Sequence, residues 1–381
     1  MSRTVFVYHD DYLKYDFGGS HILRQERLIL ARKLMQIYGL VGSEGAEELT
    51  PEPATDEDIL MVHEKEYVDV LKHLSDNPEG FSLEHGLGIT DNPVFKGMYD
   101  ASIMQVGGTL LSCKSVVGGT TDRAFNIGGG FHHALPNRAS GFCLLNDVAI
   151  GIKQLLEKYG IKRILYVDID VHHGDGVQFV FLKDPRVMTI SIHEDGRYLF
   201  PGTGFEHDVG EGEGTGYAVN IPLPPYTGNA SYLHAFNEIV APLADAFKPE
   251  IIITQLGVDA HRSDPLAHLN LTTHVYEEIA TIYDDISQRH CNNRWVAVTG
   301  GGYDMLSCSR IWTLILSKMI GRQVSDNLPT DWVDYCKNKY AIVPKGGVLK
   351  DVVKEKDLIS SEVMKVIQLV KNNVFKYHKI D

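Results

Sequence analysis

The stretch 165–176, which reads LYVDIDVHHGDG, constrains the fold of this chain more than any other feature. It begins as a predicted buried strand over 164–171, where β-branched residues recur. Asp168, Asp170 and His172 occupy every second position, so an extended strand would place them on one face, about 6.5–7 Å apart per pair. Three ionisable side chains on an apolar strand are costly to bury unless something compensates them. Metal coordination is the most economical compensation, so the stretch predicts a metal site.

Short apolar segments alternate with longer amphipathic ones along the rest of the chain. This alternation is typical of an α/β fold with a mostly parallel sheet. The predicted strands are 4–8, 124–127, 164–171, 187–192, 218–221, 250–256 and 295–299. The predicted helices are 20–38, one or two short ones within 56–74 with Thr55 or Asp56 as the N-cap, 94–113, 229–247, 272–289, 309–320 and 359–375.

Polar side chains follow five of these strands at the point where each strand ends. In parallel sheets such ends meet at one edge, which is where active sites lie. The residues concerned are His132 and His133 in GGGFHH; Asp168, Asp170, His172 and Asp175; His193, followed by FPGTG at 200–204; Asp259 and His261; and Tyr303 after GGG. Chance can place one polar group at a strand end, but five strands together indicate a catalytic site.

Each of these features has a plainer interpretation when it is taken alone. Paired histidines are often capping or surface residues, and glycine triplets are often tight turns. Asp259 could cap the following segment, and Tyr303 could be a core aromatic. The glycine-rich stretches match neither GxxxxGK[ST] nor GxGxxG, so nucleotide binding has little support. His63-Glu64 fails the HExxH pattern, because Tyr67 stands at its last position.

Composition limits the classes of partner. The 381 residues include 36 basic and 50 acidic side chains, for a net charge of −14, which argues against nucleic acid as a direct partner. The 5 cysteines are odd in number and show no CxxC spacing, so neither a disulfide framework nor a cysteine zinc site is expected. No signal peptide is visible, and no apolar run reaches about 18 residues. We therefore expect a cytoplasmic protein that does not cross a membrane.

Six blocks of the sequence resemble the signature blocks of the zinc-dependent histone deacetylase superfamily. They are DIDVHHGDG, GGGFHHA, SGFCLLND, FPGTG, GVDAHRSDPL and GGGYD, in the family's order. The resemblance is greatest to class I-like enzymes and prokaryotic acetoin-utilisation deacetylases. It implies a three-layer, arginase-like α/β fold around a mostly parallel eight-stranded sheet. We expect a catalytic domain over 1–321 and a C-terminal extension over 322–381 packed on it. Arginase itself is the rival, but its DxHxD segments hold two manganese ions.

The resemblance implies that Asp170, His172 and Asp259 are zinc ligands. Three protein ligands with a fourth position left to water is the pattern of a catalytic site. Two carboxylates and one imidazole also suit Fe(II). Two anionic ligands make the metal's water less acidic, so a separate general base is needed.

Further catalytic roles follow from the same resemblance. His132, backed by Asp168, and His133, backed by Asp175, would supply the general base, and His133 is preferred as base and later acid. Tyr303 would donate its phenol proton to the substrate carbonyl and stabilise the developing oxyanion.

The resemblance also assigns residues to the substrate. Phe142 and Phe200 match the aromatic walls of the family's tunnel, with Gly141 and Leu266 beside them. Asp91 matches a rim carboxylate that accepts hydrogen bonds from the substrate backbone. Arg27 matches a basic residue near the acetate exit path. Asp168 and Ser191 match the surroundings of a structural K⁺ or Na⁺.

The sequence departs from the family in one loop. The family often has HPxKPxR before Arg27, whereas this chain has SHILRQER and lacks both prolines, so the shape of the tunnel rim is left open. The predicted function is a zinc amidohydrolase that removes acetyl or short acyl groups from lysine side chains of proteins by metal-activated water attack. A deacetylase of polyamines or other small acetylated amines is the alternative, and a catalytically silent binding module is the rival from another class.

Overall fold

The described residues of the computed structural model, 3–353 and 357–380, contain one eight-stranded sheet. Its strands are β1 (Thr4–Val7), β2 (Glu47–Leu49), β3 (Arg123–Asn126), β4 (Ile164–Asp168), β5 (Val187–Glu194), β6 (Ala218–Leu223), β7 (Ile251–Gln255) and β8 (Trp295–Val298). They lie in the order β2-β1-β3-β8-β7-β4-β5-β6, and every neighbouring pair is parallel. The eight-stranded α/β sheet implied by the resemblance is confirmed, and it is wholly parallel.

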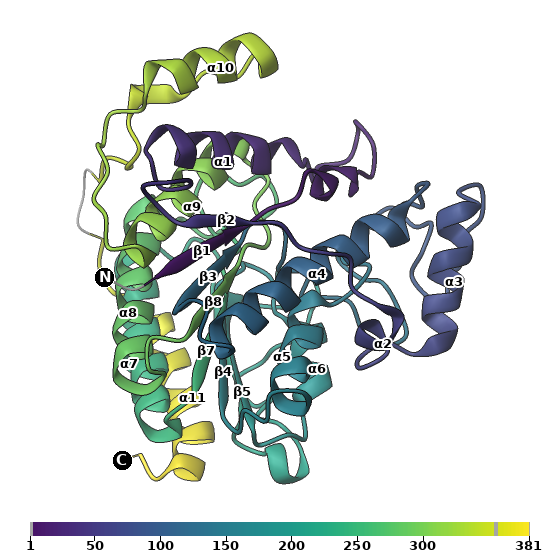
Figure 1. Cartoon of the computed structure of the whole chain (residues 1–381). Coiled ribbons are helices and arrows are strands. Elements are labelled where there is room, and N and C mark those ends of the chain that lie inside the picture. Colours follow the sequence, from purple (N-terminus) through teal and green to yellow (C-terminus); the bar gives the residue numbers. More distant parts are fainter. Residues whose placement is uncertain (1–2, 354–356, 381) are drawn as a thin grey trace.

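Helices cover both faces of this sheet, as Figure 1 shows. In chain order they are α1 (Glu26–Ile37), α2 (Asp56–Ile59), α3 (Lys65–Asp76), α4 (Met98–Val117), α5 (Asp147–Glu157), α6 (Asp175–Phe181), α7 (Asn229–Phe247), α8 (Thr273–His290), α9 (Met305–Met319), α10 (Thr330–Tyr340) and α11 (Ser361–His378). One layer contains α1, α7, α8, α9 and α11, and the other contains α4, α5 and α6. The short α2 and α3 project beyond the second layer.

The two layers explain why the central strands are apolar over most of their length, up to the polar residues at their carboxyl ends. A parallel sheet covered by helices is buried on both faces, so its strands read as continuous hydrophobic runs. Alternate residues of β4 point into different clusters: Leu165 and Val167 pack on the side of α7 and α8, whereas Ile164 and Tyr166 pack on the side of α5. The carboxyl ends of β4 and β7 are paired through Asp168 and Gln255.

The strand predicted over 164–171 is shorter in the structure, because β4 ends at Asp168. The Asp168 carboxylate accepts a hydrogen bond from the Asp170 N–H at 3.1 Å, and the Asp170 carboxylate accepts one from the His172 N–H at 3.1 Å. Aspartate side chains that bond the backbone two residues on stabilise turns rather than strands. The prediction that pleating alone would align Asp168, Asp170 and His172 was therefore wrong, and two successive turns bend this segment.

The helix predicted over 20–38 begins only at Glu26. The preceding segment makes its own turns: the His21 N–H donates to the Gly18 carbonyl at 3.0 Å, and the Gln25 amide donates to the Tyr15 carbonyl at 2.9 Å. The predicted N-cap of α2 is Thr55, whose hydroxyl accepts from the Asp58 N–H at 3.3 Å.

The two C-terminal helices, α10 and α11, each pack onto an earlier part of the chain. The Trp332 indole of α10 donates to the Leu30 carbonyl of α1 at 2.9 Å, and Figure 1 shows α10 lying beyond α1 at the top of the molecule. Val363 and Val370 of α11 join the core beneath α7 and β6. The division of the chain at residue 321 stays a prediction.

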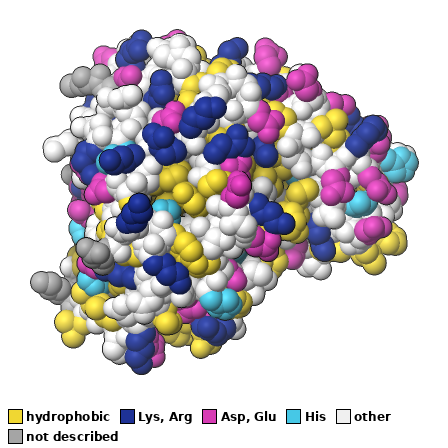
Figure 2. Space-filling view, turned by 90° about the horizontal axis from the view of Figure 1, so that it is seen from below, with side chains coloured by type: hydrophobic (Ala, Val, Ile, Leu, Met, Phe, Trp, Pro, Cys, Tyr) yellow, Lys and Arg dark blue, Asp and Glu magenta, His cyan; other side chains and the backbone are white. Residues whose placement is uncertain are grey.

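The surface mixes charges of both signs on the face drawn in Figure 2, where apolar side chains gather near the middle. Within residues 3–353 and 357–380, no helix combines the length and the apolar character that crossing a membrane requires.

Candidate active site

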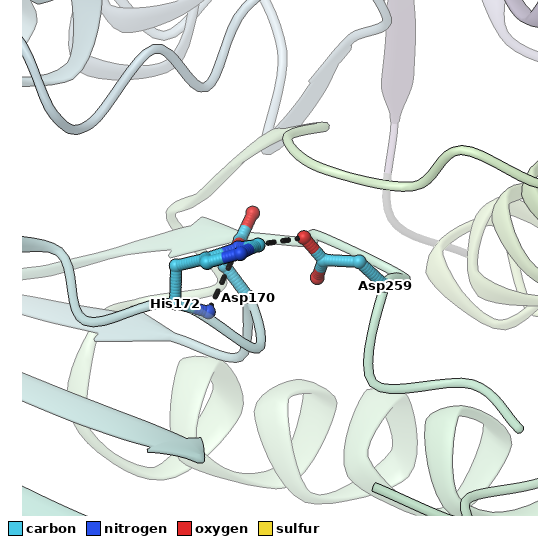
Figure 3. Close-up of side chains that lie close together, drawn as sticks. All are labelled: Asp170, His172 and Asp259. Carbon is cyan, nitrogen blue, oxygen red and sulfur yellow. Dashed lines mark hydrogen bonds and ion pairs between the residues drawn. The ribbon is translucent and has the colours of Figure 1, made fainter. Parts of the chain in front are cut away.

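The three predicted ligands Asp170, His172 and Asp259 converge on one point. Their ligating atoms all lie within 4.8 Å of one another, and all three residues are buried. His172 Nδ1 lies 3.0 Å from Asp170 Oδ1 and 3.1 Å from Asp259 Oδ2. Figure 3 shows the imidazole ring between the two carboxylates.

Two strand ends supply these ligands. Asp170 and His172 lie in the turns after β4, and Asp259 follows β7, the neighbouring strand. The Val171 N–H donates to Asp259 Oδ1 at 2.8 Å, which ties the two segments together. The remaining oxygen of Asp259 faces His172.

The electrostatics of this cluster fit a bound cation. Burial and the charge of Asp170 raise the pKa of Asp259 to about 7. Burial alone would lower the pKa of His172, but its hydrogen bonds with Asp170 and Asp259 outweigh burial and raise it to about 10. Both directions have one cause: two buried carboxylates this close together require a positive charge between them. Carboxylate and imidazole ligands of this kind suit a divalent metal ion.

His132 and Asp168 form a buried pair beside the cluster. His132 Nδ1 lies 2.7 Å from Asp168 Oδ2, and the Tyr166 hydroxyl donates to the same oxygen at 2.6 Å. Burial alone would lower the pKa of His132, but the charges of Asp168 and Asp170 raise it to about 9. The predicted backing of His132 by Asp168 is therefore a direct contact.

His133 and Asp175 form the second pair, at 2.7 Å between Nδ1 and Oδ1. The two histidine rings lie 4.0 Å apart between centroids. Burial, together with the charge of His132, lowers the pKa of His133 to about 4. His133 is therefore a neutral imidazole at neutral pH, in contrast to its neighbour.

Tyr303 lies across a narrow cavity from the two histidines. The cavity is lined by both histidines, Gly141, Phe142, Asp170, Tyr303, Leu23, Arg27, Phe131, Cys143 and the glycine pairs 129–130 and 300–301. Burial raises the pKa of the Tyr303 phenol well above its usual value, so the phenol keeps its proton. The backbone of Tyr303 is fixed, because its N–H donates to Asp264 Oδ2 at 2.8 Å.

Aromatic side chains surround this cavity. The Phe142 ring meets the Tyr303 ring edge-on at 5.8 Å, and the Phe200 ring meets the His133 ring edge-on at 5.1 Å. Gly141 lies between them with φ +51°, and a Cβ there would lie 2.4 Å from His133. Only glycine fits this position without displacing the histidine.

Three predicted substrate residues lie outside the cavity lining: Phe200, which packs against His133, together with Asp91 and Leu266. Asp91 is on the loop before α4, and Leu266 is on the loop after Asp259; both are partly exposed. Their roles stay predictions. Arg27 is buried and donates to the carbonyls of Gly300 and Gly302 at 2.8 and 3.0 Å.

The predicted monovalent-cation residues lie on adjacent strands. Asp168 of β4 and Ser191 of β5 are register partners. The Ser191 hydroxyl lies 2.8 Å from His193 Nδ1.

Two residues around the site were missed at the level of sequence. The Gln255 amide donates to Asp170 Oδ2 at 2.8 Å, and Asp264 receives the Tyr303 N–H. Gln255 carried a usable signal, since it is a polar residue at the carboxyl end of the apolar segment EIIITQL. Asp264 lies in the block GVDAHRSDPL, but its residue type gave no separate signal, because an aspartate before a proline is common in loops.

Comparisons with known proteins agree with this geometry. A family model described as histone deacetylase domain matches residues 21–319. The acetoin utilization protein AcuC of Bacillus subtilis (strain 168) is 40% identical over 336 residues, which cover 87% of this chain and 86% of that protein.

Two solved structures are similar to this chain over nearly its whole length. The crystal structure of an HDAC homolog from Aquifex aeolicus has a TM-score of 0.88 and 31% identity, covering 97% of this chain and 100% of that chain. An HDAC homolog complexed with SAHA has a TM-score of 0.87, 31% identity and the same coverage. Together with the family model and the AcuC relative, these similarities show that the chain belongs to the histone deacetylase family.

Proposed function

We propose that this deacetylase hydrolyses the amide bond of acetyl-lysine, or of a similarly short acyl-lysine, in a protein or peptide. The observation that carries the proposal is the convergence of three buried ligand atoms within 4.8 Å, next to a cavity lined by His132, His133 and Tyr303.

The metal held by Asp170, His172 and Asp259 is proposed to be zinc, and Fe(II) suits the same donors. When bound, the metal supplies a Lewis acid that polarises a carbonyl and makes water more acidic. The proposal also keeps K⁺ or Na⁺ near Asp168 and Ser191 as a structural ion.

His133 is the proposed general base. It is neutral at neutral pH, and Asp175 holds its ring from the opposite side, so Nε2 is free to accept a proton from the attacking water. The same proton then passes to the departing lysine amine, which leaves as the C–N bond breaks. His132, held by Asp168, is the proposed second histidine beside the reacting centre, where it stabilises the oxyanion.

Tyr303 is the proposed electrophilic partner. Its phenol stays protonated and can donate a hydrogen bond to the oxygen that gains negative charge as water adds to the carbonyl. The fixed backbone of Tyr303 supports this role, since a donor that is already in position pays no reorganisation cost during the reaction.

An apolar, aromatic entrance suits an acylated lysine. Acylation removes the charge of the lysine nitrogen, so its methylenes can lie between Phe142 and Phe200 without burying a cation. Gly141 and Leu266 complete the proposed walls, and Asp91 is the proposed rim acceptor for the substrate backbone. Cytoplasmic location and the lack of direct nucleic-acid contact stay predictions from the sequence.

One experiment tests the chemistry and the substrate class together. Turnover is measured on acyl-lysine peptides and, in parallel, on acetylated polyamines, with metal removed by chelation and then restored as zinc or Fe(II). We expect turnover of acetyl-lysine peptides that is lost on chelation and recovered on metal addition. Exclusive turnover of the polyamines would favour the small-amine alternative, and no turnover on either class would overturn the proposal.

The ligand assignment has its own test. Asp170→Ala, His172→Ala and Asp259→Ala are each expected to lose both bound metal and activity, whereas Asp285→Ala, at an aspartate of α8 with a 58% exposed side chain, should lose neither. Stoichiometric metal retained in all three ligand variants would reject the assignment.

A further inference from the structure

The C-terminal strap, residues 341–353 between α10 and α11, lies beyond the residues 21–319 that the family model matches. It brings one nearly buried carboxylate, Asp351, back to the loop that follows Asp259. The Asp351 side chain is only 10% exposed. A carboxylate this buried needs partners.

Asp351 has partners on three different elements. Its Oδ2 accepts from His261 Nε2 at 2.7 Å and from the Thr273 N–H, in the first turn of α8, at 3.0 Å. Its Oδ1 accepts from the Arg310 guanidinium of α9 at 3.0 Å. One carboxylate thus joins α8, α9 and the loop that carries Asp259.

From His261 a chain of side-chain contacts leads to the residue after Tyr303. His261 Nδ1 lies 2.7 Å from the Ser263 hydroxyl, which donates to Asp304 Oδ2 at 2.6 Å. Asp304 directly follows Tyr303 and caps α9 through the N–H groups of its first turn. This side-chain link therefore ends at the backbone that carries the phenol.

A second link runs through the backbone. The His261 carbonyl accepts from the Asp264 N–H at 2.8 Å, and Asp264 Oδ2 accepts from the Tyr303 N–H at 2.8 Å. Two separate links, one through the Ser263 side chain and one through the Asp264 backbone, therefore join His261 to Tyr303. The side chain of His261 contacts Asp351 through Nε2.

Burial alone would raise the pKa of Asp351, but the His261 hydrogen bond and the charge of Arg310 hold it well below the usual value of a carboxyl. Asp351 is therefore ionised at neutral pH. Its removal would leave the His261 and Arg310 side chains, 2% and 13% exposed, without this partner. Buried polar groups left without partners find new ones, so we expect the loop that carries His261 to shift.

We propose that Asp351 is a positioning residue for Tyr303, which it holds through His261 and the two links from it. This inference rests on the proposed role of Tyr303 in deacetylation. It gives the C-terminal strap a part in the reaction, although no strap residue lines the active-site cavity.

The test uses the full-length chain with Asp351→Ala, Asp351→Asn and a matched control. The control is Asp357→Asn, because Asp357 also follows α10 and also accepts an N–H at the start of a helix, from Ala230 of α7 at 3.1 Å. We expect Asp351→Ala to lower kcat about 10–100-fold with KM changed less than about twofold, since a misplaced group costs rate rather than substrate binding. Asp351→Asn keeps an acceptor for His261 and Thr273, so its loss should be smaller. Asp357→Asn should keep full kcat.

A double-mutant cycle separates positioning from general destabilisation. In a Tyr303→Phe background the phenol is already absent. The double variant Tyr303→Phe, Asp351→Asn should therefore have a kcat less than about threefold below that of Tyr303→Phe alone. Thermal unfolding of each variant shows whether it is folded at the assay temperature. If Asp351→Asn lowers kcat equally in both backgrounds, or leaves kcat unchanged in a folded protein, the inference is overturned. Failure of the proposed function is distinguishable, because the unchanged chain would then lack deacetylase turnover altogether.

Discussion

The side-chain amide of Gln255 donates to Asp170 Oδ2 at 2.8 Å, on the carboxylate oxygen that His172 does not contact. The Gly301 N–H donates to the same oxygen at 2.7 Å. Two donors thus engage this oxygen, and Asp170 Oδ1 is the oxygen that contacts His172. The last residue of β7 thus orients a proposed ligand from the turns that follow β4.

Gln255→Met tests this orientation, because methionine keeps the length and removes the donor. We expect zinc affinity to fall about 10–100-fold, as is typical when a partner of a metal ligand is lost. Competition with a chelator measures it. Gln154→Met, at a buried glutamine of α5, is the matched control and should bind zinc normally. Equal affinity in both variants would show that Gly301 alone orients Asp170.

Tyr303→Phe removes one hydroxyl and keeps the ring that packs against Phe142. If this hydroxyl stabilises the oxyanion, kcat should fall on the order of 100–1000-fold. Zinc content and KM should hardly change, because the phenol is not a ligand and its bond strengthens in the transition state. Tyr38→Phe is the control for the loss of a phenol elsewhere, because the Tyr38 hydroxyl donates to the Ser325 and Asn327 carbonyls. Near-normal turnover of Tyr303→Phe would remove it from the mechanism.

Asp91→Ala tests whether the substrate is a peptide. Loss of a carboxylate that accepts backbone N–H groups should lower kcat/KM for acetyl-lysine peptides about 10–100-fold. Small acetylated amines have no such backbone and should be affected less than about twofold. Glu84→Ala, at an exposed acidic residue of the same loop, is the control for charge. A uniform loss on peptides and amines would argue that Asp91 supports the loop rather than the substrate.

His63 predicts a pH dependence of stability. Burial lowers its pKa to about 4 from an ordinary value of 6.5, and its Nε2 accepts the Asn146 N–H at 2.9 Å. Above pH 6.5 the His63 ring is neutral in both the folded and the unfolded chain, so its burial does not make the stability depend on pH. As pH falls from 6.5 toward 4, His63 becomes protonated in the unfolded chain but stays neutral in the folded chain. The free energy of unfolding therefore falls.

His63→Gln isolates this contribution, since a glutamine oxygen can still accept the Asn146 N–H. The free energy of unfolding should fall between pH 7.5 and 5 by about 2 kcal/mol more in the unchanged chain than in His63→Gln. Denaturant titrations at both pH values measure it. His207→Gln, at a histidine with a 73% exposed side chain, should retain the full dependence. If the free energy of unfolding fell equally with pH in all three proteins, protonation of His63 would not contribute to the pH dependence of stability.

Strong local periodicity made most of the fold predictable. The helix over 229–247 was predicted with the bounds of α7, because its apolar face repeats over many turns. β2 was missed because Glu47–Leu49 has two charged residues in three and no apolar repeat. α6 was missed because it begins at Asp175, inside a segment whose histidines and glycines conceal any helical pattern.

The proposed metal ligands could be predicted because the sequence shows their residue types and spacing directly. The residues that hold these ligands in place could not be predicted in this way. Asp170 and His172 share a strand end that any reader can see, but the turns that bend them together follow from side-chain hydrogen bonds to the backbone. Asp351 lies 90 residues from His261, and nothing local to either residue predicts the pair.

The packing of α10 on α1 has a consequence for a nascent chain. Leu30 and Leu34 of α1 are covered in part by Trp332 and Cys336 of α10, and the Trp332 bond to Leu30 spans 302 residues. A ribosome synthesises α1 long before α10, so part of the apolar face of α1 stays exposed during most of translation. Chains that expose such faces early are the ones that chaperones bind. The apolar face of α1 is thus completed only when the chain is nearly finished.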